Sequence, residues 1–187
     1  GNSRIRGLEA DVRFRPQSST QLRAIVQFLD AEYRSFSYVQ VRTPVPPLTG
    51  CAAALSAVPN LYTVDCGEKQ PYNSPRWALS LEARQSFVLK NLTVTALAGT
   101  HFRSERNIGF AFLPEQRIEA TWTSHAQLIL TPSDGPWELA AFVRNIEGDR
   151  IPQFMIYHPF SNALVAATST PRVLGLRLST RFGTQNR

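Results

Sequence analysis

Apolar and polar side chains alternate along much of this sequence, most regularly in the segment 172–182, which reads RVLGLRLSTRF. Successive side chains of a β-strand point to opposite sides, so this segment predicts one face of leucines ending at Phe182 and one face that carries the arginines. A strand with lipid on one side and water on the other has this pattern. Strands of soluble β-sandwiches also alternate, so the interpretation depends on the rest of the chain.

Six other segments alternate in the same way, and their lengths favour a membrane barrel. Strands of globular proteins average roughly five or six residues, whereas a tilted membrane strand needs roughly 9 to 11. The expected strands are near the longer figure. They cover approximately residues 7–15, 21–33, 76–87, 92–103, 117–130, 137–145 and 172–182.

The connections between these segments alternate between short and long. Short turns on one side and long loops on the other are typical of an outer-membrane barrel, in which the short turns are periplasmic. The short turns are expected at 16–20, 88–91 and 132–136, and the long loops at 34–75, 104–116 and 147–171.

Aromatic residues lie near both ends of the expected strands. With the short turns in the periplasm, the chain ends on the periplasmic side and the aromatic residues form two interfacial girdles. The periplasmic girdle would contain Phe14, Phe87, Trp137 and Phe182, and the extracellular girdle Tyr33, Trp77 and Phe102.

Composition supports one folded domain and excludes several classes of protein. The chain has 187 residues, of which 43% are hydrophobic, enough for a substantial buried surface. No run of about 18 apolar residues predicts a membrane helix, and no signal segment opens the chain. Because the first residue is Gly1 rather than Met, we expect a processed or truncated product with any export signal upstream.

The net charge of +6 comes almost entirely from arginine, because Lys69 and Lys90 are the only lysines. The arginines recur singly at alternate positions instead of clustering in a stripe that neutralises phosphates. We therefore expect no nucleic-acid partner. Residues of a lumen wall or rim have this spacing.

The loop 34–75 contains both cysteines, Cys51 and Cys66. Two cysteines in one loop of an exported protein suggest a disulfide, which would contribute about 3 kcal/mol in the entropy model. Free thiols in a cytosolic protein are the alternative. A metal site would need more ligands.

No catalytic motif is present, and the three histidines are isolated in the sequence. Glu9 and Asp11 share a face with Arg13 and Arg15, which indicates a charge ladder along a lumen rather than an acid and base pair. We expect no enzyme activity, no cofactor and no bound metal.

Several short motifs, in their order along the chain, resemble the C-terminal part of the barrel of TonB-dependent outer-membrane receptors. The residues 1–9 are similar to the first residues of a strand in that family, and Leu29 to Tyr33 to its end. Further similarities are 73–77, 137–146 and the closing strand 171–182. Two departures are the residues 147–150, which lack a tyrosine common in the family, and 183–187, which extend past the usual terminal phenylalanine.

The resemblance implies an antiparallel transmembrane β-barrel segment, residues 1–187, from the last third or so of a barrel of about 22 strands. The plug domain that contacts the TonB complex would precede Gly1, so the TonB complex would act only through a segment absent from this chain. The whole protein would import a scarce nutrient, such as iron-siderophore, cobalamin or an oligosaccharide. Its partners would be outer-membrane lipid, an extracellular small-molecule ligand and the barrel-assembly machinery, which would recognise Phe182.

Ligand contacts cannot be carried over from the family, because its loops vary most. Arg103, Arg106 and Tyr157 are the expected ligand contacts in the extracellular loops, with a solvated rim as the alternative. Two other classes of protein stay open: a soluble exported β-sandwich that binds a ligand, and a porin or adhesin barrel that does not use TonB.

Overall fold

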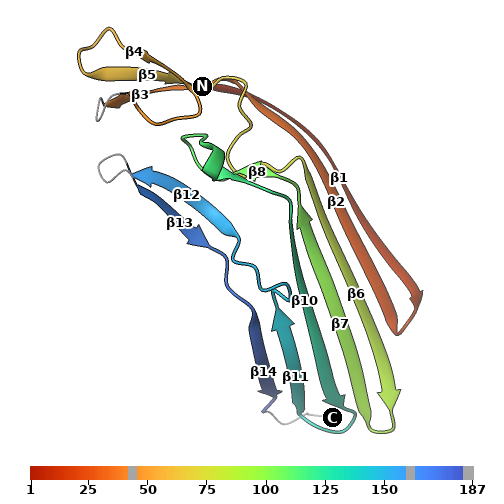
Figure 1. Cartoon of the computed structure of the whole chain (residues 1–187). Helices are drawn as coiled ribbons and strands as arrows, with labels where there is room; N and C mark the ends of the chain where they lie inside the picture. The colour runs from red at the N-terminus through yellow and green to blue at the C-terminus, as the bar shows by residue number, and fades with distance from the viewer. Residues whose placement is uncertain (42–45, 159–162, 183–187) are drawn as a thin grey trace.

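The computed structural model describes residues 1–41, 46–158 and 163–182. An open antiparallel sheet of seven long strands dominates it, and each strand pairs with the long strands that precede and follow it in the chain (Figure 1). The predicted all-β class, with seven antiparallel strands that form an incomplete barrel, is confirmed. The strands are β1 (Asn2–Gln17), β2 (Thr20–Ser35), β6 (Trp77–Leu89), β7 (Leu92–Arg103), β10 (Thr121–Pro132), β11 (Trp137–Arg144) and β14 (Val173–Thr180).

The strand ends agree with the sequence prediction except at two places. The first strand begins at Asn2, earlier than expected. The fifth begins at Thr121 instead of near residue 117, because β9 (Arg117–Ile118) pairs with β8 (Arg106–Asn107) in a separate two-stranded sheet. Alternation alone cannot show which partner a short segment chooses.

Cross-strand pairing gives the sheet two chemically different faces. Residues paired across strands lie on the same face, so the register joins the outward side chains of all seven strands into rows. We call this side the apolar face. From the Leu8–Phe28 pair to the short turns it carries no charged side chain in the described strands. One row consists of Phe14, Leu22, Ala83, Ala98, Ala126, Val143 and Leu174.

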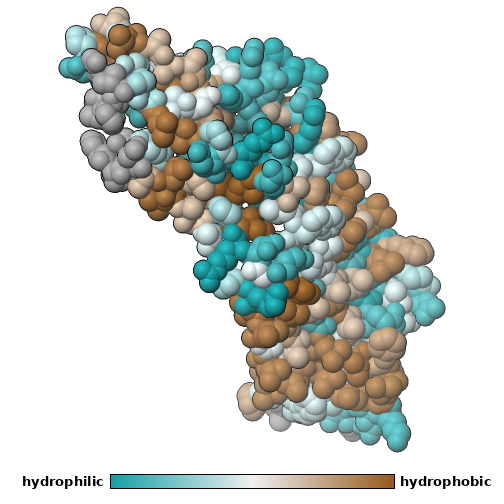
Figure 2. Space-filling model, viewed as in Figure 1, coloured by the Kyte–Doolittle hydropathy of each residue, from teal (hydrophilic) through white to brown (hydrophobic). Residues whose placement is uncertain are grey.

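The apolar face is exposed. Leu8 is 74% exposed, and Leu176 of β14 is 77% exposed. Apolar side chains gather over the lower part of the sheet in Figure 2. Twelve residues of β10, at roughly 3.3 Å each and tilted by about 40°, span about 30 Å, which is the thickness of a bilayer's hydrocarbon core.

The buried core of the molecule lies in the long connections rather than in the sheet. In the described part of the chain, Ala140 is the one buried apolar residue of the long strands. The others belong to the connections at one end of the sheet, which we call the long-loop end; the opposite end is the short-turn end (Figure 1). They are Tyr62, Val64, Cys66, Ile108, Leu113 and Ile151.

The long connections, expected as loops, contain small sheets of their own. The first holds a three-stranded sheet in the order β3-β5-β4, and the last holds the hairpin of β12 and β13. These strands are four to seven residues long, too short for alternation to predict them. Their bounds are β3 (Ser37–Val41), β4 (Ala52–Leu55), β5 (Leu61–Asp65), β12 (Pro152–His158) and β13 (Ala163–Thr168).

The middle connection, 104–116, joins the other two. The Gly50 amide donates to the Ala111 carbonyl at 2.7 Å, and the Met155 amide donates to the Ile108 carbonyl at 2.9 Å. Gln116, fully buried in the short 3-10 helix (Pro114–Gln116), donates its side-chain amide to the Met155 carbonyl at 3.0 Å. The three connections therefore form one packed layer, which we call the loop layer.

A disulfide joins Cys51 and Cys66, which are separated by 15 positions in sequence and have their Cα atoms 4.9 Å apart. Cys51 precedes β4 and Cys66 follows β5, so the bond closes one end of the pair β4 and β5. Cys66 has no exposed surface.

We predict that the double variant C51S/C66S loosens the β3-β5-β4 sheet without affecting the long strands. In the entropy model a closed loop of this length contributes about 3 kcal/mol, so the amides of Leu61–Asp65 should exchange hydrogen about a hundred times faster. Hydrogen-exchange mass spectrometry measures this, with the amides of β7 as the internal control. Unchanged exchange in β5 would show that the bond adds no stability there.

Candidate functional site

The second face of the sheet, which we call the polar face, carries the charged side chains. The Arg23 guanidinium donates two hydrogen bonds to the Asp11 carboxylate, at 2.8 and 3.2 Å, and Arg13 donates one at 3.2 Å. Water still reaches all three groups, because each side chain is 33% exposed or more. Of the predicted charge ladder, Asp11 and Arg13 form a network with Arg23 across β1 and β2.

The ladder holds more arginine than carboxylate. In the long strands, the polar face carries seven arginines and four acidic side chains. The arginines are Arg13, Arg15, Arg23, Arg84, Arg103, Arg144 and Arg177, and the acids are Glu9, Asp11, Glu82 and Glu138.

Two of the histidines that are isolated in the sequence lie together on the polar face. The rings of His101 and His125 stack with their centroids 5.7 Å apart, and Ser80 Oγ is 2.8 Å from His101 Nδ1. Gly99 makes room for this pair, because a Cβ atom there would lie 2.5 Å from the His125 ring. Both histidines have inward positions on neighbouring expected strands, but the register that joins them is not visible in the sequence.

Arg103 lines a hollow of about 540 Å³ at the long-loop end of the polar face. Glu9 and Gln27 share the hollow, and Gln27 donates a hydrogen bond to the Glu9 carboxylate at 3.1 Å. Asn73, from the first long connection, also lines it. Charged and amide groups therefore converge where the sheet meets the loop layer.

Arg106, the second expected ligand contact, is 2% exposed. Its Nη1 donates to Thr121 Oγ1 at 3.2 Å, and its Nε has no hydrogen-bond partner among the described residues. Burial lowers the pKa of Arg106, and the nearby positive charge of Arg103 lowers it further. The structure thus brings Arg103 and Arg106 close together, but only Arg103 faces an open space.

Tyr157, the third expected contact, lies on β12, paired with Leu164 of β13. An aromatic cluster joins all three long connections. Tyr72 stacks on Phe110 with ring centroids 5.1 Å apart, and Phe154 meets both edge-on at 6.0 and 6.3 Å. Phe110 is 52% exposed, so the cluster presents an aromatic surface. The sequence offers no signal for it, because its members come from three separate loops.

The aromatic residues of the strands also differ from the predicted girdles. Tyr33 points to the polar side, where it stacks on Phe36 at 4.6 Å, and so it does not join Trp77. Phe28 takes that place, 4.8 Å from Trp77, and Trp122 packs on Phe102 at the same distance. Tyr33 has an odd position in β2 and Phe28 an even one, so their side chains point to opposite faces of the sheet.

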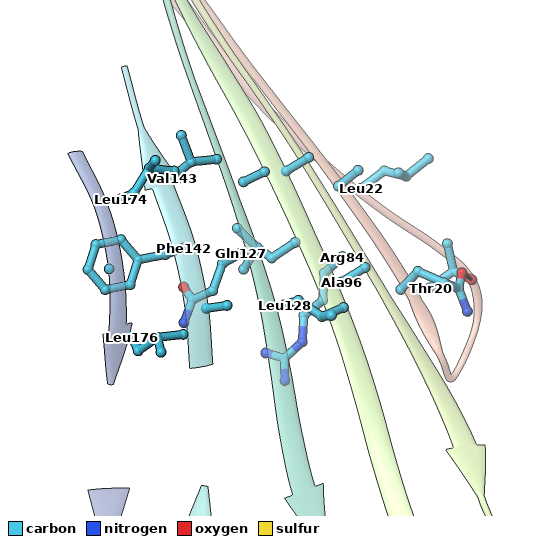
Figure 3. A pocket seen from close by; sticks show the side chains of 17 residues that line it. Thr20, Leu22, Arg84, Ala96, Gln127, Leu128, Phe142, Val143, Leu174 and Leu176 are labelled. Atoms are coloured by element: carbon cyan, nitrogen blue, oxygen red, sulfur yellow. Dashed lines mark hydrogen bonds between the residues drawn. The ribbon is translucent and has the colours of Figure 1, made fainter. Parts of the chain in front are cut away.

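A shallow trough of about 960 Å³ lies on the apolar face. Leu22, Leu128 and Leu176 surround it from β2, β10 and β14 (Figure 3). Its floor is made of small side chains, and the polar residues Thr20, Gln85 and Gln127 line it as well. The floor consists of Ala83, Ala96, Ala98, Ala126 and Ala141.

Two structural requirements, those of a metal site and of a membrane-spanning helix, are not met in the described residues. No group of three or more His, Cys, Asp or Glu side chains there is arranged to hold a metal ion. None of the helices in that part of the chain combines the length and hydrophobicity needed to cross a membrane.

Phe182, the expected assembly signal, lies two residues after the end of β14 and is 92% exposed. The end of β14 lies beside the turn between β10 and β11, where the Arg181 amide donates to the Pro136 carbonyl at 2.8 Å. This places Phe182 at the short-turn end.

No protein-family model matches this sequence, and no curated protein is significantly similar to it. The fold is similar to the crystal structure of the siderophore receptor PiuA from Acinetobacter baumannii, with a TM-score of 0.61 and 16% identity. The match covers 94% of this chain and 21% of the receptor chain. At this identity the likeness shows the fold: an open sheet that corresponds to one part of a receptor's structure.

We predict that removing the charge of Arg106 while keeping its length does not weaken the loop layer. A buried guanidinium without a carboxylate partner is costly, so R106M should retain or increase the hydrogen-exchange protection of residues 104–120. R106A leaves a cavity and should lower the local opening free energy by about 2 kcal/mol. R103M, at the open hollow, is the control and should change it by less than about 0.5 kcal/mol. An R106M as unstable as R106A would show that the charge itself is needed.

Proposed function

We propose that this chain is the C-terminal part of the β-barrel of a TonB-dependent outer-membrane receptor that takes up a scarce nutrient. The observation that carries the proposal is the division of the sheet into an exposed apolar face without charge and a polar face rich in arginine. A lipid bilayer outside and a water-filled lumen inside satisfy both faces. The likeness to a siderophore receptor supports this reading at the level of the fold.

The orientation follows the usual asymmetry of such barrels, with short turns in the periplasm and long loops outside the cell. In this orientation the loop layer is extracellular and Phe182 is periplasmic. Bilayer lipid contacts the apolar face, the barrel-assembly machinery acts on the last strand, and a plug domain before Gly1 couples the barrel to TonB.

The ligand contacts the extracellular end of the lumen. Arg103 with its hollow and the exposed aromatic surface of Tyr72, Phe110 and Phe154 offer charge, hydrogen bonds and ring stacking. These groups suit an iron-siderophore, and also suit cobalamin or an oligosaccharide. Arg106 contributes by holding the base of the loop layer and Tyr157 by lining its last hairpin.

A soluble β-sandwich would need a second layer over the apolar face. In the described residues nothing covers Leu174, Leu176 and Leu178, which are 70 to 77% exposed.

The other alternative is a porin or adhesin barrel that does not use TonB. An experiment on nutrient uptake distinguishes it from the proposed receptor. Loss of uptake on deletion of the gene, and equal loss on deletion of TonB, is expected only for a TonB-dependent receptor.

The location is tested by fractionation of cells that express the protein. Recovery in the outer-membrane fraction after a carbonate wash is expected. A soluble monomer obtained without detergent would exclude the barrel.

We predict opposite outcomes for one substitution at two neighbouring positions of β10. Leu128 lies on the apolar face and Gln127 on the polar face. L128R places a charge in lipid, which costs about 2 to 4 kcal/mol near the bilayer midplane, so the amount in the outer membrane should fall severalfold. Q127R adds the same charge on the lumen side and should leave the amount unchanged. Immunoblots of washed membranes measure both, and equal loss in both variants would contradict the assignment of faces.

A further inference from the structure

Four arginines gather on the polar face close to the short-turn end, where β1, β2 and β6 run side by side. Arg13 and Arg23 are directly opposite each other in the register of β1 and β2. Like charges at such positions repel. Asp11 lies between them and accepts hydrogen bonds from both guanidinium groups, so one carboxylate serves two cations.

The two other arginines have no such partner. Arg15 follows Arg13 on the same face, and Arg84 pairs with Gln21 in the register of β2 and β6. Neither side chain has a hydrogen bond or ion pair within the described residues. The nearest other acid is Glu82, opposite Arg23. Four cations therefore share two carboxylates.

These side chains enclose a hollow of about 290 Å³. Its lining includes Arg13, Arg15, Arg23 and Arg84, with Gln21, Glu82 and the apolar Leu97. On the other face at the same level lie Phe14, Leu22 and Ala83. An apolar medium behind the sheet weakens screening from that side, which strengthens the positive potential in the hollow.

We propose that this hollow is an anion-binding site that receives a carboxylate or phosphate group of a small solute inside the lumen. The guanidinium fork matches two oxygens of such a group, and Arg15 and Arg84 have donors free to make those bonds. The inference rests on the proposed function in one respect: the polar face must line a lumen. It deepens that function, because the solute that reaches the periplasmic half of the wall then carries negative charge.

The test measures binding of inorganic phosphate and of citrate to the full chain in zwitterionic detergent at low ionic strength. Phosphate binding is followed by broadening of its phosphorus resonance, and citrate by competition. The double variant R15Q/R84Q should bind phosphate about tenfold more weakly or worse, because both free donors are removed. R6Q/R117Q loses the same charge elsewhere, at exposed positions of β1 and β9, and should bind like the unchanged chain.

Three results would overturn the proposal. They are no broadening by the unchanged chain at 20 mM phosphate, roughly twenty thousand times a dissociation constant of about 1 µM; equal binding by all three proteins; or binding of a hexaglutamate peptide without binding of phosphate and citrate. The last result would assign the hollow to an acidic polypeptide segment. If R15Q/R84Q does not fold, as judged by circular dichroism, R84Q alone replaces it and should weaken binding severalfold, since Arg84 has no bond within the fold to lose.

Fractionation of the same variants separates this site from the proposed function. A chain that stays in the outer membrane but binds no small anion overturns only the anion site. A chain that is soluble without detergent overturns the barrel, whatever its affinity for phosphate.

Discussion

The pairing register of the seven long strands is the constraint on which the rest of the structure depends. Side chains alternate with a period of two, so a slip of one residue in any pair would exchange the two faces of that strand. In the observed register, Leu22, Ala83 and Ala98 share one row, and Arg23, Glu82 and Gly99 share the next on the opposite face. Between neighbouring strands the backbone hydrogen bonds are made within the ladder, and neither face has to provide them. One face can therefore lack charged side chains from the Leu8–Phe28 pair to the short turns, while the other carries the arginines and acids.

The loop layer is stabilised by other interactions than the long strands. Its residues pack as in a small globular domain, around Ile108 and Val64, both without exposed surface. A disulfide and the hydrogen bonds of the connection 104–116 hold it, so its shape does not depend on lipid. The two regions meet at Arg103, the last residue of β7. The proposed ligand site at this border would combine a fixed wall below with side chains from three loops above.

The sequence was sufficient to predict the long strands because their pattern repeats over many residues and is bounded by strong turns such as 132–136. It was not sufficient for features that depend on pairing between distant segments. His101 and His125 stack because Gly99 leaves space beneath the His125 ring, and Tyr72 meets Phe110 and Phe154 because three loops fold onto one another. Tyr33 is a different case: its position within β2 fixes its face, so attention to odd and even positions excludes it from the girdle. Arg106 is buried because β8 pairs with β9. Strands of two residues are too short for the sequence to predict this pairing.

The two outermost strands of the sheet constrain how the proposed barrel is completed. Among the described residues β1 and β14 each have a paired strand on one side only, and unpaired backbone groups are costly in lipid. Further strands must therefore flank both edges in the membrane. The edges differ in length, with 16 residues in β1 and 8 in β14, so the neighbour of β1 can pair over a much longer distance. Arg13 and Arg15 lie on β1 itself, which means that this neighbouring strand would form the remaining wall of the arginine hollow.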